Sequence, residues 1–470
     1  MQALIPAHTD TQRLYSWGTL ILIELLLGYA ILVVPLYAIP LFLTVLLILV
    51  IFFSPECAYI VLILSLNQLL LLEIQYPYSL PPRTVRLFPV PLDSFPLVQL
   101  ISYILIAAVF FSWIIARMAK VRPPYPLTRL DLPMTALFIW TAVSLLWTPD
   151  VGTGLLELGV FMCACLAFFL TVALIRTKKI LTLVIVALIF MGLVNAGVAF
   201  YSLRGDPVFK ELYQIDNVLL SFGFIPSARE RGSGLAGPNY TAYFLNVCTM
   251  LSMGMLLVAT KVKKRVALTF IVLFLIYGTL TTLSKGGLIG LLAGLLFLGL
   301  ACRPIRRRFF TYLFVIAAAL IVLYVLVYFS WPWPDRAVLT GEGRPSLFPR
   351  SMLWQTGFED LIESGGFGYG CGNLFPAHSL YFFALFELGI PGFFFLLWVL
   401  FRWFSTIRST LKKSPGPYYE TMILCTTAGV VSIMAHGLVD FLHLELVLWI
   451  MLGMGMALTN LVDGSLRQGK

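Results

Sequence analysis

Long runs of apolar residues, separated by short polar segments, recur along the whole 470-residue chain. A helix needs about 20 such residues to cross the hydrocarbon core of a bilayer, and many of the runs have about that length. The pattern predicts an all-α, polytopic bundle of about 12 to 14 transmembrane helices. The predicted spans begin near Trp17, Leu36, Cys57, Leu97, Pro133, Leu155, Ile180, Asn239, Val266, Lys285, Phe309, His378, Glu420 and Phe441.

Composition supports this prediction. Hydrophobic residues make up 60% of the chain and charged residues only 11%, and a soluble domain could not bury so much apolar surface. Polar linkers between domains are missing, so we expect one membrane domain over residues 1–470. The first apolar run has no evident cleavage site and is expected to remain in the protein. The cysteines show no disulfide or metal-binding spacing.

The formal net charge of +10 comes from Lys and Arg residues in short clusters between the apolar runs. This distribution is typical of topology-setting charge and speaks against nucleic acid as a partner. The five main clusters lie at residues 117–122, 176–179, 261–265, 303–308 and 402–413. Because two predicted spans separate each successive pair, all five can be cytoplasmic, and with 14 spans both termini are cytoplasmic too.

Two long segments, residues 203–238 and 331–377, then fall on the non-cytoplasmic side. A compact domain rarely keeps loops beyond about 15 residues unless they are functional or carry structure of their own. We expect the second loop, which lies between late helices, to be partly helical. Both loops are candidate functional regions, although their length alone fits a passive cover equally well.

The first long loop ends in RERGSGLAGPNY, which places Arg229 and Arg231 among glycines just before a helix expected to begin at Asn239. Glycines let backbone N–H groups approach an anion, and guanidinium forks bind phosphate oxygens in pairs. The segment is therefore a candidate pyrophosphate site. The alternative is a turn with interfacial arginines.

A tight turn between two apolar runs contains Ser284 and Lys285, followed by two glycines. On the predicted topology Lys285 lies at the non-cytoplasmic surface, against the usual bias of positive charge. Either it binds an anion or its ammonium group extends to the lipid headgroups.

The second long loop carries Arg350 and Trp354, which are four residues apart and would share one helix face. A glycine-rich run, GGFGYGCGN, and then His378 follow. The chain has four histidines, of which His378, His436 and His443 are expected at the outer surface. Imidazole is the usual group for moving a proton near neutral pH, whereas a structural hydrogen bond is the alternative role for a histidine at a helix start.

These segments together resemble the O-antigen ligase and polymerase superfamily of bacterial envelope proteins over residues 229–392. In HSLYFFALFELGIPG, His378 and Ser379, nine further residues, Gly389, two residues and Gly392 reproduce the ligase pattern His-[Asn/Ser/Gln]-x9-Gly-x2-[Gly/Thr/Tyr]. The motif follows a long outer loop with RSMLW and a glycine run, which makes the match more specific.

The segment around Arg231, with Asn239 after it, also resembles the outer loop that precedes the histidine motif in this family. One departure is Lys285, because many relatives have Ser-Arg-Gly where this chain has Ser-Lys-Gly. Lysine keeps the positive charge but lacks the bidentate fork of arginine.

The resemblance implies a glycosyltransferase of the bacterial inner membrane whose active face is periplasmic or extracellular. Such enzymes transfer a glycan from an undecaprenyl-pyrophosphate carrier to an acceptor hydroxyl by inverting displacement, with no metal or cofactor. By resemblance, His378 would be the catalytic base. The cations for the pyrophosphate would be Arg231, Arg350, Lys285 and Arg229. The supporting residues would be Ser379, Asn239, Gly389, Gly392 and Trp354.

The long loop and the histidine motif favour a ligase, which delivers the glycan to lipid A core or, in some relatives, to a protein. The alternative within the superfamily is a polymerase, which joins two carrier-linked chains. A membrane transporter is the alternative of another class. Charge inside the predicted spans is scarce, and neither inverted repeats nor a broken helix are evident, which makes transport the weaker hypothesis.

Overall fold

The computed structural model of the chain describes residues 55–65, 97–120, 123–203, 238–302, 347–372, 378–440 and 446–468. Within these ranges every regular element is a helix, which confirms the predicted all-α fold. The chain divides into two compact units, Met1–Ala58 and Tyr59–Lys470, and the second unit contains all the contacts discussed below.

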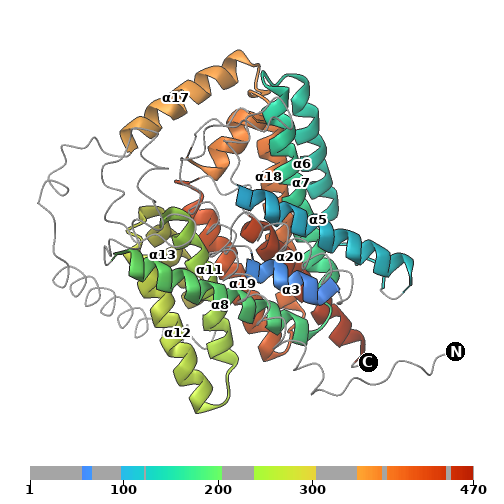
Figure 1. Cartoon of the computed structure of the whole chain (residues 1–470), viewed down its shortest axis with the longest axis vertical. Coiled ribbons are helices and arrows are strands. Elements are labelled where there is room, and N and C mark those ends of the chain that lie inside the picture. The colour runs from blue at the N-terminus through green and yellow to red at the C-terminus, as the bar shows by residue number, and fades with distance from the viewer. Residues whose placement is uncertain are drawn as a thin grey trace, which may run out of the picture. The chain divides into compact units, whose positions relative to one another are not determined.

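Seven described helices are long and apolar enough to cross a membrane, so the protein is multi-pass (Figure 1). They are α7 (Val151–Leu174), α8 (Lys178–Leu203), α11 (Pro238–Val258), α12 (Val262–Thr281), α18 (Leu380–Lys412), α19 (Pro417–His436) and α20 (Leu446–Gln468). Further apolar helices are α3 (Pro55–Ser65), α5 (Leu97–Met118), α6 (Asp131–Val143) and α13 (Lys285–Ala301). A 3-10 turn, Ser144–Leu146, follows α6, and α17 (Leu347–Glu363) lies within the predicted second loop.

The predicted spans near Trp17, Leu36 and Phe309 lie outside the described residues. At every other predicted position a helix begins within a few residues of the expected start. The total of 12 to 14 spans therefore stays a prediction, as does the single domain over residues 1–470.

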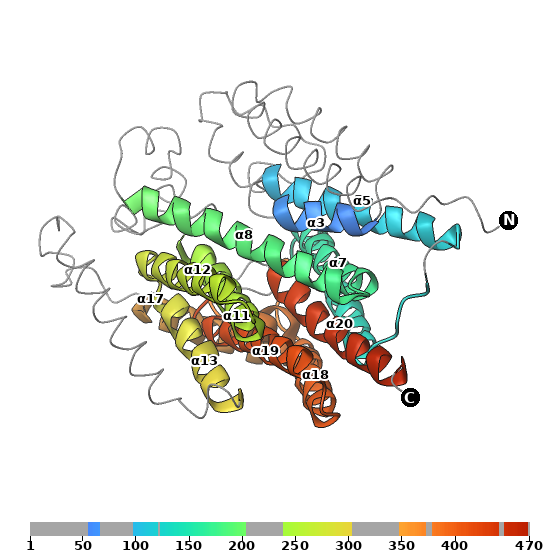
Figure 2. The same ribbon diagram turned by 90° about the horizontal axis from the view of Figure 1, so that it is seen from below.

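Helices α11 and α19 pack against each other, and both contact α13. Helix α20 contacts both α7 and α19 (Figure 2), and α6 packs on α18 (Figure 1). Three glycines on one face of α13 let α19 approach closely, because a Cβ atom on each would lie within 3.1 Å of an atom of α19. The facing pairs are Gly286 with His436, Gly290 with Ser432, and Gly294 with Ala428.

Several predicted basic clusters meet at one end of this packed unit. The Arg176 guanidinium donates a hydrogen bond to the Pro124 carbonyl at 2.8 Å, which joins the segment after α5 to the α7–α8 link. The ammonium of Lys178 lies 3.8 Å from the centre of the Tyr418 ring at the start of α19. The clusters at 117–122, 176–179 and 402–413 therefore flank the same end, as one cytoplasmic side would require.

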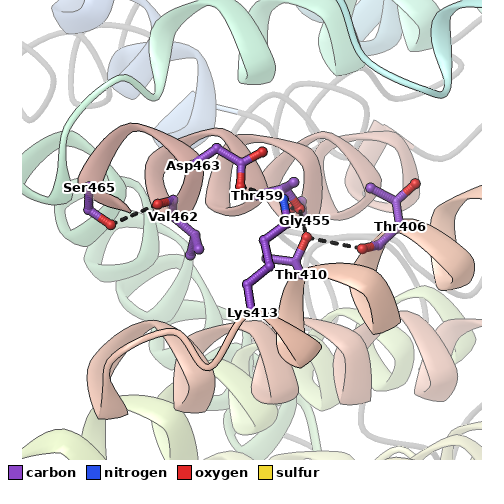
Figure 3. Close-up of polar contacts among 8 residues, drawn as sticks. All are labelled: Thr406, Thr410, Lys413, Gly455, Thr459, Val462, Asp463 and Ser465. Carbon is purple, nitrogen blue, oxygen red and sulfur yellow. Dashed lines mark hydrogen bonds and ion pairs between the residues drawn. The ribbon is translucent and has the colours of Figure 1, made fainter. Parts of the chain in front are cut away.

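The end of α20 lies beside the end of α18 (Figure 3). Lys413 forms an ion pair with Asp463 at 2.5 Å, and one turn deeper the Thr410 hydroxyl bonds to the Thr459 hydroxyl at 3.2 Å. The last described helix thus ends at the basic end of the unit. The opposite end, where α7 and α18 begin and α19 finishes, is called the outer end below.

Candidate functional site

The predicted turn between α12 and α13 is built around Ser284, which caps the N-terminus of α13. Its hydroxyl accepts a hydrogen bond from Gly287 N at 3.1 Å and donates one to Asn239 Oδ1 at 2.9 Å. Leu283, just before it, has a φ of 49°, which non-glycine residues rarely adopt. This turn holds Lys285 at the first position of α13 with its side chain exposed.

Buried polar groups beneath the turn fix α11, α12 and α13 to one another. Asn246, two turns along α11 from Asn239, donates a hydrogen bond from Nδ2 to the Gly287 carbonyl at 2.7 Å. Its Oδ1 accepts one from the Thr279 hydroxyl at 3.2 Å. Hydrogen bonds between membrane helices of this kind restrict their relative movement, so the turn rests on a fixed base.

His378 and Ser379 precede α18 directly. Ser379 is the N-cap, and its side chain accepts a hydrogen bond from Phe382 N at 3.4 Å. His378 is half-buried and has a φ of 44°, one of four positive φ values among the described non-glycine residues. A backbone held in a sparsely populated conformation is a pointer to a functional position.

The end of α19 contacts both of these elements. Leu380 N donates hydrogen bonds to the Gly437 carbonyl at 2.7 Å and to the Asp440 carbonyl at 2.9 Å. The ring of His436 lies against Gly286. His436 is at the outer end as expected, but it is not at the surface, because its side chain is only 1% exposed.

Helix α18 is broken at Gly389, whose φ of 70° and ψ of −173° are not helical. Part of the glycine-rich run fills the gap. Tyr369 N donates to the Phe386 carbonyl at 2.9 Å, and Gly370 N donates to the Glu387 carbonyl at 2.8 Å. The apolar pattern predicted no broken helix, and at Gly389 that prediction is wrong.

Two further backbone groups at the break, the Leu388 carbonyl and the Ile390 N–H, also form hydrogen bonds. The Trp140 indole N–H donates to the Leu388 carbonyl at 2.8 Å, and Ile390 N donates to the Gly366 carbonyl at 2.9 Å. Non-helical backbone at membrane depth is tolerated where protein groups replace the lost helical bonds. The second motif glycine, Gly392, packs so closely on Leu388 that a Cβ atom would overlap it. Both motif glycines therefore have structural roles.

The glycine-rich run is also attached to the start of α7. The Thr148 hydroxyl donates to the Cys371 carbonyl at 2.8 Å, and Cys371 N donates to the Ser144 hydroxyl at 3.1 Å. Gly372 lies directly on Gly154, leaving no room for a Cβ atom. The described end of the run, Cys371 and Gly372, is thus fixed to the start of α7.

Helix α17 contains both Arg350 and Trp354, as the RSMLW pattern predicted. The Trp354 ring lies 5.0 Å from that of Phe382 on α18, measured between centroids. Phe358, one turn further along, packs edge-on against Phe386 at 5.1 Å. Helix α17 is therefore attached to the first turns of α18. The Arg350 side chain is outside the described part of the structure.

Two acidic residues that the sequence did not single out are buried near the glycine run. Glu157 on α7 and Glu387 on α18 are 6% and 0% exposed. Burial, reinforced by these two carboxylates, raises the pKa of the Cys371 thiol. Glu157 also lines a small apolar cavity with Phe161 and Trp449. Across the described residues, no group of three or more His, Cys, Asp and Glu side chains could hold a metal ion.

The structure brings some of the predicted site residues together and leaves others undescribed. Those gathered at the outer end are Asn239, Lys285, His378 and Ser379. Arg229 and Arg231 lie outside the described residues. The sequence assigned no role to His436, and the four-residue spacing of His436 and Asp440 is the one signal of their pairing.

No protein-family model matches the chain, and no curated protein matches it.

Proposed function

We propose that this protein is a glycosyltransferase of the bacterial inner membrane that moves an oligo- or polysaccharide from an undecaprenyl-pyrophosphate carrier to a sugar hydroxyl. The proposal combines the motif resemblance with one structural observation. The Lys285 turn, Asn239 and the start of α18 at His378 meet at the end of the helices away from the basic clusters. A cation, a polar anchor and a proton acceptor from separate helices suit a reaction with an anionic leaving group.

The proposed reaction is a direct displacement. The oxygen of the acceptor hydroxyl bonds to the anomeric carbon as the bond from that carbon to the pyrophosphate oxygen breaks. The hydroxyl proton passes to the imidazole of His378, and undecaprenyl pyrophosphate leaves. The anomeric centre is inverted, and the scheme uses no covalent enzyme intermediate, metal or cofactor. His378 is only half-buried, as a residue that meets a substrate must be.

Negative charge grows on the pyrophosphate as it leaves and requires fixed positive groups nearby. Lys285 supplies one such group, and the N-terminus of α13 adds the partial positive charge of its dipole. In the proposal Arg231, Arg350 and Arg229 complete the set. Because the Ser284 cap and the polar groups beneath it hold the turn, the charge is oriented before the donor binds.

Purified protein in lipid nanodiscs, supplied with a carrier-linked glycan and an acceptor, tests the proposal. His378→Asn is the informative variant, since asparagine tolerates a positive φ better than alanine but cannot act as the base. We expect glycan transfer by the wild type and a loss of about 100-fold or more in the variant. Gln355→Ala, at an exposed position on α17, is the control and should transfer normally. Full turnover by His378→Asn would remove the histidine from the mechanism.

The acceptor distinguishes the two subtypes. In an O-antigen ligase-like enzyme, the favoured subtype, the product is glycan joined to lipid A core, or to protein in some relatives. In a polymerase the product is a longer glycan that remains on the carrier. Offering lipid A core and a second carrier-linked glycan in parallel assays separates these outcomes by product mass.

A transporter is the second candidate, and two observations favour it beyond the sequence pattern. Helix α18 is discontinuous at Gly389, and Glu157 and Glu387 are buried inside helices near that break. Broken helices and intramembrane acids are features of ion-coupled transport sites. Transport would be supported by counterflow of labelled solute in proteoliposomes that Glu387→Gln abolishes. An enzyme would show no counterflow.

A further inference from the structure

The last residue of α19 and the turn after it, residues 436–440, form what we call the α19 end turn. His436 and Asp440 are four residues apart, with the imidazole Nε2 3.7 Å from the carboxylate Oδ2. Their side chains are 1% and 8% exposed. Neither ring nitrogen makes a hydrogen bond within the described residues, so the carboxylate is the polar group that orients the ring there.

The ring packs against α13, which begins at Lys285, and against α11. A Cβ atom on Gly286 would lie 2.6 Å from His436 Cδ2 and 2.7 Å from Nε2, so this glycine leaves just enough room for the imidazole. On another side the ring meets Tyr243 of α11 edge-on, with centroids 6.3 Å apart. A shift of His436 would therefore move the first residues of α13, including Lys285.

The same short segment holds the start of α18. Leu380 N is bonded to two carbonyls of the α19 end turn, those of Gly437 and Asp440. The Tyr381 hydroxyl donates to the Met434 carbonyl at 3.2 Å, one turn earlier on α19. Since Leu380 is two residues after His378, the α19 end turn contacts both halves of the candidate site.

We infer that His436, oriented by Asp440, is a positioning residue that sets the Lys285 turn relative to His378. The inference rests on the proposed function. His436 is too deeply buried to touch a substrate, so its effect passes through Gly286 and Leu380. In a direct displacement the cation must face the leaving group while the base faces the acceptor, and a misplacement of about 1 Å can cost about 100-fold in rate.

The kinetic test compares His436→Ala and Asp440→Asn with the wild type in nanodiscs. Asp440→Asn keeps the shape of the side chain and leaves the backbone carbonyl that bonds Leu380 in place. We expect His436→Ala to lower kcat by about 10- to 100-fold with little change in KM, and Asp440→Asn to act in the same direction. Ser432→Ala, one turn earlier on the same face of α19, is the matched control and should keep its kcat. Unchanged kcat in His436→Ala would overturn the inference.

Hydrogen exchange tests the positioning role without the reaction. Amides of residues 285–290 and of Leu380 should exchange about tenfold faster in His436→Ala than in wild type, and at the wild-type rate in Ser432→Ala. Unchanged exchange at both segments would contradict the inference. If the wild type transfers no glycan, the proposed function fails, whereas this measurement still decides whether His436 fixes the turn.

A double variant separates positioning from simple space filling. His436→Ala leaves a void beside Gly286, and a methyl group from Gly286→Ala would occupy part of it. We expect the double variant to recover thermal stability while kcat stays low, because the orienting contact with Asp440 is still absent. Recovery of both stability and kcat would show that the ring only fills space, and would overturn the inference.

Discussion

Replacing Gly389 by alanine should strongly destabilise the protein. The glycine has a φ of 70° and a ψ of −173°, a region almost restricted to glycine, and forcing another residue there costs about 1–3 kcal/mol. The added Cβ atom would overlap the Gly366 carbonyl oxygen and lie 2.5 Å from the carbonyl carbon of Phe367. Overpacking of this kind costs about 1–3 kcal/mol more. The expected loss is therefore about 2–6 kcal/mol.

Unfolding in mixed micelles, followed by tryptophan fluorescence, measures this loss. The control is Gly159→Ala on α7, where nothing lies within 4 Å of the added Cβ atom and the backbone is helical. That variant should be unchanged or more stable by about 0.5–1 kcal/mol. If Gly389→Ala unfolds at the same point as Gly159→Ala, the break in α18 and its filling by the glycine run are refuted.

Three further predictions concern the outer end. Ser284→Ala should lower the free energy of unfolding by about 1 kcal/mol because α13 loses its cap, and an unchanged unfolding midpoint would contradict that role. Lys285→Arg should bind a carrier pyrophosphate more tightly than wild type and Lys285→Ala more weakly, as measured by fluorescence titration; equal affinities would remove the lysine from the donor site. Because it is fully buried, the Cys371 thiol should resist maleimide at pH 8 until the protein is unfolded, and rapid labelling of the folded protein would show that it is accessible.

The helix positions can be predicted from the sequence because hydropathy reports directly on burial in lipid. The start of α13 at Lys285 and of α11 beside Asn239 follow from where the apolar runs begin. The position of the basic clusters at the same end of the helices can also be predicted from the sequence, since charge distribution sets topology. For the same reason Lys285 and His378 could be assigned to the same end before their contacts were known.

The break at Gly389 could not be predicted, because an apolar run reads the same whether its backbone is helical or interrupted. Gly-Ile-Pro at 389–391 is a signal in retrospect, since proline removes a helical hydrogen bond and glycine permits the unusual φ. The burial of Glu157 and Glu387 could not be predicted either, because the sequence does not say which side chains surround a single acidic residue. The role of His436 depends on its contact with Gly286, about 150 positions earlier in the chain.

In the proposed function, the outer end of the protein transfers a glycan from a pyrophosphate-linked carrier. The most direct measurement is the stoichiometry of products made by the purified wild-type protein from an undecaprenyl-pyrophosphate glycan and its acceptor, with no nucleotide sugar present. One undecaprenyl pyrophosphate should be released for each glycosylated acceptor, and the new linkage should have the opposite anomeric configuration to that of the donor. Folded protein that forms no such product with any lipid-linked donor or acceptor, or a product with retained configuration, would contradict the account.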